Sequence, residues 1–135
     1  MDDQKLVSYM NSLLGFHRHN GIRLVEAGPG RAVVEAGITR DSLNPMGFIH
    51  GGLMFTMADM AAGCACLTHG RGVVTLGASA SYLAPARGDR LRAAATEEHC
   101  GKTTGVYRVE VTDPEEKLVA VFTVTMYLTE KTLEL

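Results

Sequence analysis

The sequence predicts an α+β fold in which an antiparallel sheet of about six strands wraps around one long central helix. The first observation is a helical stretch over residues 52–68 that is apolar on nearly every side, which is typical of a helix buried all round. The second is that a hairpin pattern precedes this stretch and four β-rich stretches follow it, joined by short connections. Because short connections favour antiparallel neighbours, such strands can cover the helix on all sides only if their sheet curls around it.

The N-terminal region predicts a short helix followed by a hairpin. Residues 3–15 carry apolar side chains at helical spacing, and Gly15 with the GFHRHNG stretch predicts the end of that helix. Segments 22–26 and 32–38 flank a Gly-Pro-Gly turn at positions 28–30, which is a hairpin signal. The apolar positions of the helix are Leu6, Met10, Leu13 and Leu14.

A loop over residues 42–49 leads into the central helix. An Asn-Pro pair and Gly47 mark the loop, and Gly70 marks the end of the helix at residue 68. A membrane span is the alternative for residues 52–68. The Gly-Gly at the start, the aspartate at the midpoint and the lack of a second hydrophobic segment favour a buried helix instead.

Four β-rich stretches complete the predicted sheet. The first is long and ends at Pro85, and the last two alternate apolar with polar side chains, as strands with one buried face do. Asp113-Pro114 predicts the turn between the last two. The four stretches are residues 73–83, 89–99, 104–112 and 118–128.

Composition predicts one globular domain over residues 1–135, with 46% apolar and 21% charged residues. A net charge of −2 without a basic stripe argues against nucleic-acid binding. Cys64, Cys66 and Cys100 lack zinc-ligand spacing and are interpreted as small buried hydrophobes, and His69 has no partner pattern, so we expect no metal site. The acidic, amphipathic N-terminus is unlike a signal peptide, so we expect a cytoplasmic protein.

One carboxylate stands inside the otherwise apolar central helix. Asp59 carries the only formal charge between Gly51 and Thr68. A carboxylate in apolar surroundings costs several kcal/mol unless it is hydrogen-bonded, paired or protonated. We therefore interpret Asp59 as a catalytic group, either a general base on water or a nucleophile on a carbonyl. A structural aspartate paired with an arginine is the alternative.

A His-Gly-Gly sequence, from His50 to Gly52, lies at the start of the same helix. A helix N-terminus presents free backbone N–H groups and favours negative charge, and glycine lets a substrate approach the backbone closely. These properties predict an oxyanion hole for acyl transfer, with His50 orienting the substrate carbonyl or donating to it. The alternative is that His50 caps a turn and the glycines supply a helix entry with special dihedral angles.

The spacing between these two groups predicts a site built from two chains. Asp59 lies eight residues past Gly51, which is about 12 Å along a helix that rises about 1.5 Å per residue. A carbonyl held at the Gly51 N–H needs its attacking group within roughly 3–3.5 Å. One helix cannot supply both groups, so we expect a two-fold dimer in which Asp59 of one chain faces Gly51 of the other.

The pattern N-x-x-G-x-x-H-G-G, followed by an aspartate nine residues after the histidine, resembles the hotdog-fold acyl-CoA thioesterases of the phenylacetate-degradation (PaaI) type. Segments 81–86, 101–107 and 120–127 are also similar to this family, so the resemblance runs from about residue 20 to residue 128. It implies a hotdog fold, which is the arrangement of a curved sheet around a central helix. The motif residues are Asn44, Gly47, His50, Gly51, Gly52 and Asp59.

The resemblance implies a role for each motif residue. Gly51 donates its N–H to the thioester carbonyl, Asp59 activates water or attacks directly, and Asn44 and His50 orient substrate and nucleophile. A hydroxyl early in the third strand often helps to place the water in this family, and Thr75 lies there. The family also implies homodimers commonly paired into tetramers, and aryl-acetyl, hydroxybenzoyl or medium-chain acyl substrates, of which a phenylacetyl-CoA-like thioester is our expectation.

Coenzyme A enters as part of the substrate, and we expect no cofactor. Its phosphates need cations, and the arginines that follow the third strand are candidates, with a solvated turn as the alternative. The start of the central helix is expected to line the acyl pocket. The phosphate candidates are Arg87, Arg90 and Arg92, and the pocket candidates are Gly52, Leu53, Met54 and Met57.

Two other functions on the same fold remain open. A hotdog dehydratase or hydratase needs a catalytic histidine paired with an acid in other motifs, which this sequence does not show. A non-catalytic acyl-CoA binding protein typically lacks a positioned acid or gains a DNA-binding segment, whereas Asp59 is present here and no such segment is visible. The site must therefore decide between them, because a fold alone does not establish a function.

Overall fold

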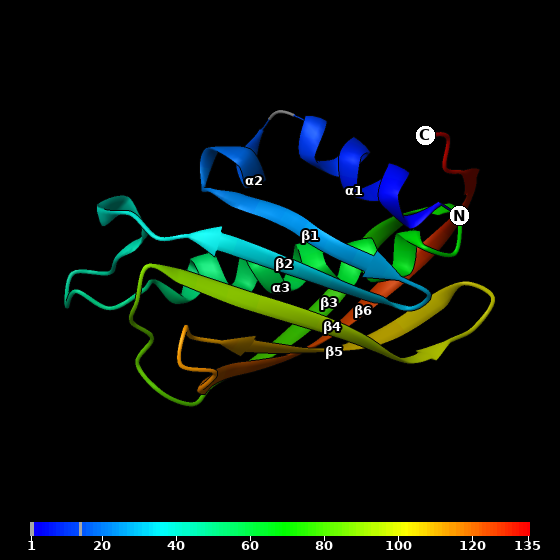
Figure 1. Ribbon diagram of the computed structural model, residues 1–135. Coiled ribbons are helices and arrows are strands. Elements are labelled where there is room, and N and C mark those ends of the chain that lie inside the picture. The colour runs from blue at the N-terminus through cyan, green and yellow to red at the C-terminus, as the bar shows by residue number, and fades with distance from the viewer. Residues whose placement is uncertain (1, 14) are drawn as a thin grey trace.

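A computed structural model describes residues 2–13 and 15–135 and confirms the predicted helix wrapped by a six-stranded antiparallel sheet (Figure 1). The sheet curves around the long helix, while the two short N-terminal helices lie outside it beside β1. The elements are α1 (Asp3–Ser12), α2 (Phe16–His19), β1 (Ile22–Gly28), β2 (Arg31–Gly37), a 3₁₀ turn η1 (Arg40–Ser42), α3 (Gly51–Leu67), β3 (Arg71–Tyr82), β4 (Arg90–Cys100), β5 (Thr104–Thr112) and β6 (Leu118–Thr132).

The central helix α3 begins one residue earlier than predicted because His50 serves as its N-cap. Its side chains are buried on most sides, which explains why the segment shows no polar face. Just beyond its end, Gly70 has a φ of 84°, a conformation that glycine adopts without a steric penalty. Within the described residues, no helix combines the length and apolar character needed to cross a bilayer.

The strand order is β1-β2-β4-β5-β6-β3, with every neighbouring pair antiparallel. The expectation that β3 and β4 are neighbours, based on their short connection, is wrong, because β3 pairs with β6. Three strand spacings of about 4.8 Å separate β4 from β3, roughly 14 Å in total. The connection over residues 83–89 can extend to about 23 Å, so a short loop need not join paired strands.

The core lies between α3 and the concave face of the sheet. On β5 the buried side chains are Tyr107, Val109 and Val111, as the alternation in the sequence predicts. On β6 the buried set includes Phe122 and Val124. The helix contributes small residues and methionines to the same core, so sheet and helix bury one continuous apolar volume.

The N-terminal helix covers one edge of the sheet. The Asn11 side chain accepts a hydrogen bond from the Leu24 N–H at 2.9 Å and donates one to the Leu24 carbonyl at 2.7 Å, so it occupies the outer edge of β1. The helix ends at Ser12 rather than at residue 15, and Leu14 lies outside the described residues. The FHRH segment, expected only to end the first helix, forms the single turn of α2, in which the backbone N–H groups of His19 and Asn20 donate hydrogen bonds.

The opposite edge of the sheet, β3, is uncovered within one chain. Most of its side chains are exposed, including Val74 at 55% and Leu76 at 60%. An exposed edge strand with apolar side chains is a ready template for pairing with another strand. The edge carrying Asn11 is therefore closed by the chain itself, whereas β3 is available to a partner.

Candidate active site

The N-terminus of α3 presents one backbone donor that has no acceptor among the described residues. The His50 Nδ1 atom accepts the Gly52 N–H at 2.8 Å, and the His50 carbonyl accepts the Leu53 N–H at 3.1 Å. Across residues 2–13 and 15–135, the Gly51 N–H meets no hydrogen-bond acceptor. It therefore lies at the positive end of the helix dipole as a free donor, as an oxyanion site requires.

The cap also fixes the state of the His50 ring. Because Nδ1 accepts a backbone N–H, it carries no proton, and the proton of the neutral imidazole lies on Nε2. The ring is exposed, so Nε2–H is available to a ligand. His50 therefore caps the helix, which the sequence analysis gave as the alternative role. The cap leaves its Nε2–H as a donor for a substrate.

Tyr82, at the end of β3, holds the Gly51 peptide. Its hydroxyl donates to the Gly51 carbonyl at 2.9 Å, and its ring packs edge-on against Phe122, with 5.8 Å between the ring centroids. Partial burial raises the pKa of Tyr82, which keeps the hydroxyl protonated as a donor. Sequence reasoning missed Tyr82, because an aromatic residue at a strand end gives no signal of what it contacts.

The close approach of Tyr82 favours a glycine at position 51. A Cβ atom built there would lie 3.1 Å from the Tyr82 ring, closer than ordinary packing allows. A side chain at this position would push the ring or the helix N-terminus away. Gly51 is therefore explained by the close approach of Tyr82 as well as by access to its N–H.

Asn44 shapes the loop that precedes the helix. Its Oδ1 accepts the N–H groups of Met46 at 3.0 Å and Phe48 at 3.1 Å, and its own N–H donates to the Phe48 carbonyl at 2.7 Å. Gly47 completes the turn with a φ of 84°. Asn44 thus orders the loop backbone, which leaves its amide nitrogen as the group free to meet a ligand.

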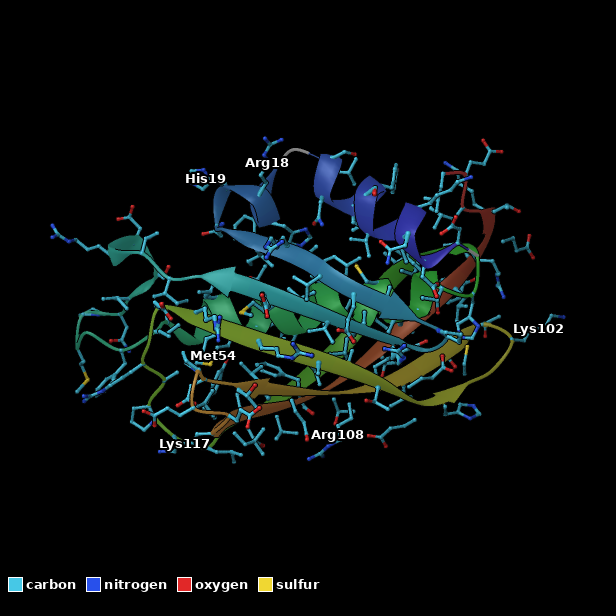
Figure 2. The ribbon with its side chains drawn as sticks, viewed as in Figure 1. Arg18, His19, Met54, Lys102, Arg108 and Lys117 are labelled. Carbon is cyan, nitrogen blue, oxygen red and sulfur yellow. The ribbon has the colours of Figure 1, made fainter. Side chains whose placement is uncertain are left out.

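A cavity of about 440 Å³ lies between this loop, the start of α3 and the end of β3. Figure 2 shows Met54 at the loop end of α3, and this residue lines the cavity. Leu53 and Met57, which were also expected at the acyl pocket, do not line this cavity of the single chain, and like Met54 they belong to the buried core. The residues of interest around the cavity are Asn44, Phe48, Gly51, Met54 and Tyr82.

Asp59 lies outside that cavity, further along the helix. Its Oδ1 accepts the Thr75 hydroxyl at 2.6 Å, a bond between α3 and β3. The same hydroxyl is 3.5 Å from the Met126 sulfur. Asp59 is half-buried within the chain, so its carboxylate is reachable from the uncovered β3 side. The structure thus brings Thr75 to Asp59, and brings Asn44 and Tyr82 to Gly51.

The two groups of residues remain separate within one chain. Gly51 and Asp59 occupy one continuous helix, so about 12 Å of helical rise separates them, as the sequence predicts. The Gly51 side has a donor and a cavity, and the Asp59 side has a carboxylate and a hydroxyl. Each chain therefore carries two half-sites that its own backbone cannot join.

The arginines near the cavity differ in their surroundings. Arg87 lies over the Phe48 ring, with 4.6 Å between Cζ and the ring centroid, and lines a separate hollow that also contains Asp113, Glu115 and Lys117. Arg92 lies within 3.9 Å of Glu26 and 3.8 Å of Glu35. Arg90 lines a hollow whose other charged groups are mostly carboxylates. Of the three, Arg87 contacts a residue of the cavity wall, Phe48, and forms no salt bridge with a carboxylate among the described residues.

Sequence comparisons with known proteins agree on one family for this chain. Residues 46–120 match the model of the thioesterase superfamily. The acyl-coenzyme A thioesterase PaaI of Escherichia coli is 38% identical over 103 residues, which cover 76% of this chain and 74% of that protein. The 1,4-dihydroxy-2-naphthoyl-CoA hydrolase of Listeria monocytogenes is 30% identical over 121 residues, which cover 87% of this chain and 98% of the relative.

Solved structures agree with the sequence relatives. The PaaI protein of E. coli superposes with a TM-score of 0.90 at 31% identity, covering 97% of this chain and 96% of that one. A Streptococcus mutans protein bound to acetyl-CoA superposes with a TM-score of 0.82 at 32% identity, covering 93% and 99%. These matches confirm the hotdog fold and the predicted resemblance to PaaI-type proteins. The chain belongs to the thioesterase superfamily.

Proposed function

We propose that this protein hydrolyses the thioester of an acyl-CoA to the free acid and CoA. The observation that carries the proposal is the pairing of half-sites on α3: a free Gly51 N–H beside a cavity, and an Asp59 carboxylate bound by Thr75. The first is the donor that a thioester oxyanion needs, and the second is the acid–base group that hydrolysis needs. The E. coli and L. monocytogenes relatives are named as hydrolases of CoA thioesters, which supports the same reaction here.

In the proposed reaction, the thioester oxygen accepts the Gly51 N–H and, with it, a donor from His50 or Asn44. Asp59 takes a proton from water as the water attacks the carbonyl carbon, or attacks that carbon itself and forms an anhydride that water then opens. The C–S bond breaks, and the CoA sulfur leaves as a thiolate that takes up a proton. Thr75 holds the Asp59 carboxylate in one orientation. The reaction needs no cofactor.

The site is proposed to form between two chains. The uncovered edge of β3 supports this, because its apolar side chains Val74 and Leu76 are exposed and Thr75 lies between them. A second copy packed against β3 would cover the Asp59 side of one chain with the Gly51 side of the other. We propose a homodimer with two such sites, paired further into a dimer of dimers. In this proposal each chain is one domain over residues 1–135 and acts in the cytoplasm.

We propose an aryl or medium-chain acyl group as the substrate, with a phenylacetyl-CoA-like thioester as the first candidate. The cavity wall carries Met46, Phe48 and Met54. Methionine and aromatic side chains adapt to apolar groups of several shapes. The L. monocytogenes relative is named for an aromatic acyl-CoA, which supports the aryl class.

For the CoA phosphates we propose Arg87 as the principal cation. It lies over Phe48, which lines the cavity, and a guanidinium binds phosphate in a fork geometry. Arg90 is the second candidate, although the carboxylates around its hollow disfavour an anion there. A related structure contains bound acetyl-CoA, which supports the ligand class.

A panel of aromatic and aliphatic acyl-CoA thioesters, assayed for released thiol, tests the proposal. We expect turnover with at least one member and a preference for aryl or medium-chain groups. Binding of these thioesters without turnover of any of them would favour the non-catalytic acyl-CoA binding protein. Turnover of an enoyl- or hydroxyacyl-CoA without thiol release would favour the dehydratase or hydratase class.

A further inference from the structure

A second cluster of reactive side chains lies at the other end of α3. His69 follows the helix, and Glu97 and Cys100 lie on β4. One ligand atom from each of the three residues lies within 4.8 Å of the others. The His69 Nε2 atom is 2.6 Å from Glu97 Oε1. The sequence gives no sign of this cluster, because its members lie up to 31 positions apart and match no ligand spacing.

A β-bulge places Glu97 and Cys100 on the same side of β4. Residues three apart in a regular strand point to opposite faces. Here the pairing with β5 shifts between Glu97 and His99, so that Glu98 is an extra residue in the strand. Bulges of this kind redirect side chains and are common next to functional sites. The shift turns two residues of one strand toward the same point near His69.

The carboxylate of Glu97 accepts a hydrogen bond from a buried tyrosine. Tyr107 is fully buried, and its hydroxyl donates to Glu97 Oε1 at 2.6 Å. Burial, together with its hydrogen bonds to Cys66 and Glu97, raises the pKa of Tyr107, so it stays a donor. A buried hydrogen bond that orients a carboxylate is the outer-shell support typical of a metal ligand. Glu97 is therefore fixed before any ligand arrives.

We propose that His69, Glu97 and Cys100 form a binding site for a zinc ion. An imidazole nitrogen, a carboxylate oxygen and a thiolate sulfur are all ligands that zinc accepts. Ligand atoms around tetrahedral zinc lie roughly 3.5 Å apart, so the cluster needs only small side-chain adjustments. Zinc replaces the proton between His69 and Glu97, and the thiol proton of Cys100 goes to solvent. A water molecule completes the fourth position.

Burial and the Glu97 carboxylate raise the pKa of the Cys100 thiol, so the metal itself must displace the thiol proton. Arg71 also lies close to Cys100. Its guanidinium donates to the carbonyls of Leu128, Thr129 and Lys102 at 2.7 to 2.9 Å, which keeps it on the backbone rather than on Glu97. The carboxylate thus keeps its acceptor capacity for His69, Tyr107 and a metal ion.

This site is separate from the proposed active site. The helix rises about 24 Å from Gly51 to Leu67, and His69 lies beyond its end. Figure 2 shows Lys102, in the β4–β5 turn beside Cys100, at the opposite end of the molecule from Met54. A zinc ion here would cross-link the exit of α3 to the end of β4 and would not meet the thioester. Its expected effect is on stability.

Cobalt and zinc titrations of the full-length protein test the proposal. Co²⁺ is the spectroscopic probe, because a cysteine thiolate bound to cobalt gives a charge-transfer band in the near-ultraviolet. We expect about one cobalt ion per chain with this band, displaced by zinc chloride. Zinc should raise the melting temperature of the wild-type chain. Absence of the band at excess cobalt in the folded wild-type protein would overturn the proposal without any variant.

Matched variants identify the ligands. Cys100→Ser should abolish the band and the zinc-dependent rise in melting temperature, and His69→Gln should weaken binding at least tenfold. Glu98→Gln and His99→Gln are the controls, because both residues are exposed neighbours on β4 outside the cluster. A band that survives Cys100→Ser, or equal losses in the control variants, would mean that these three residues form a hydrogen-bond network only.

Discussion

The Thr75 hydroxyl donates to Asp59 Oδ1 over 2.6 Å, linking the uncovered edge strand to the middle of the central helix. A hydrogen bond to a charged group contributes about 1.5–3 kcal/mol. If it orients the carboxylate for attack, Thr75→Val should lower kcat roughly tenfold to a hundredfold. Thr75→Ser keeps the hydroxyl and should retain most of the activity. Steady-state kinetics on both variants checks this, and equal losses in the two would point to packing instead.

Asp59→Asn should abolish most of the thioester hydrolysis. The amide keeps an oxygen that can accept the Thr75 hydroxyl, but it neither takes a proton from water nor attacks a carbonyl. A general base typically contributes about 10²–10⁴-fold, so we expect a loss of that size in kcat with little change in melting temperature. Near-wild-type turnover by the folded variant would remove Asp59 from the mechanism.

Mixed dimers test whether the site is shared. We expect Asp59→Asn chains and His50→Ala chains each to be inactive or nearly so. In an equal mixture of exchanging chains, half of the dimers are mixed, and each mixed dimer has one intact site, so roughly a quarter of wild-type activity should return. Activity is measured in the exchanged mixture and in mixed dimers purified through two different tags, which should show roughly half of wild-type activity. Confirmed exchange with no recovered activity would contradict a site made from two chains.

Charge placed on the edge strand should separate the proposed dimer. Leu76→Glu replaces an exposed apolar side chain of β3 with a carboxylate. We expect the variant to sediment as a smaller species than the wild-type protein in analytical ultracentrifugation and to lose turnover. Phe16→Glu is the control, because Phe16 is 68% exposed on α2 and lies away from β3. A fully active Leu76→Glu monomer would show that one chain suffices.

Much of the fold follows from local pattern. The apolar length of α3, the alternation along β5 and β6, and the turns that end them are features of neighbouring residues, and the structure confirms them. The pairing of β3 with β6 could not be predicted from local pattern, because strand pairing depends on how the whole sheet closes around the helix. The short helix α2 was missed for a related reason: a single turn has too few residues to show periodicity.

The residues of the site also differ in whether local sequence could predict them. Asp59 stood out because a charge in an apolar helix is conspicuous in the sequence alone, and its distance from Gly51 follows from helical rise. Leu53 and Met57 were expected at the acyl pocket together with Met54, and all three belong to the buried core, but of the three only Met54 also lines the cavity of the single chain. Tyr82 and the cluster of His69, Glu97 and Cys100 depend on contacts between distant segments.

The fit of the Tyr82 ring over Gly51 has a consequence for how this protein can change over time. A Cβ atom at position 51 would lie 3.1 Å from the Tyr82 ring, so an alanine there would require the ring to shift by a few tenths of an ångström, and a smaller residue at position 82 would remove this contact. A smaller residue at position 82, in turn, gives up the hydroxyl that steadies the helix entry. The two positions are therefore expected to vary together among descendants of this chain, and substitution at either one alone should be rare.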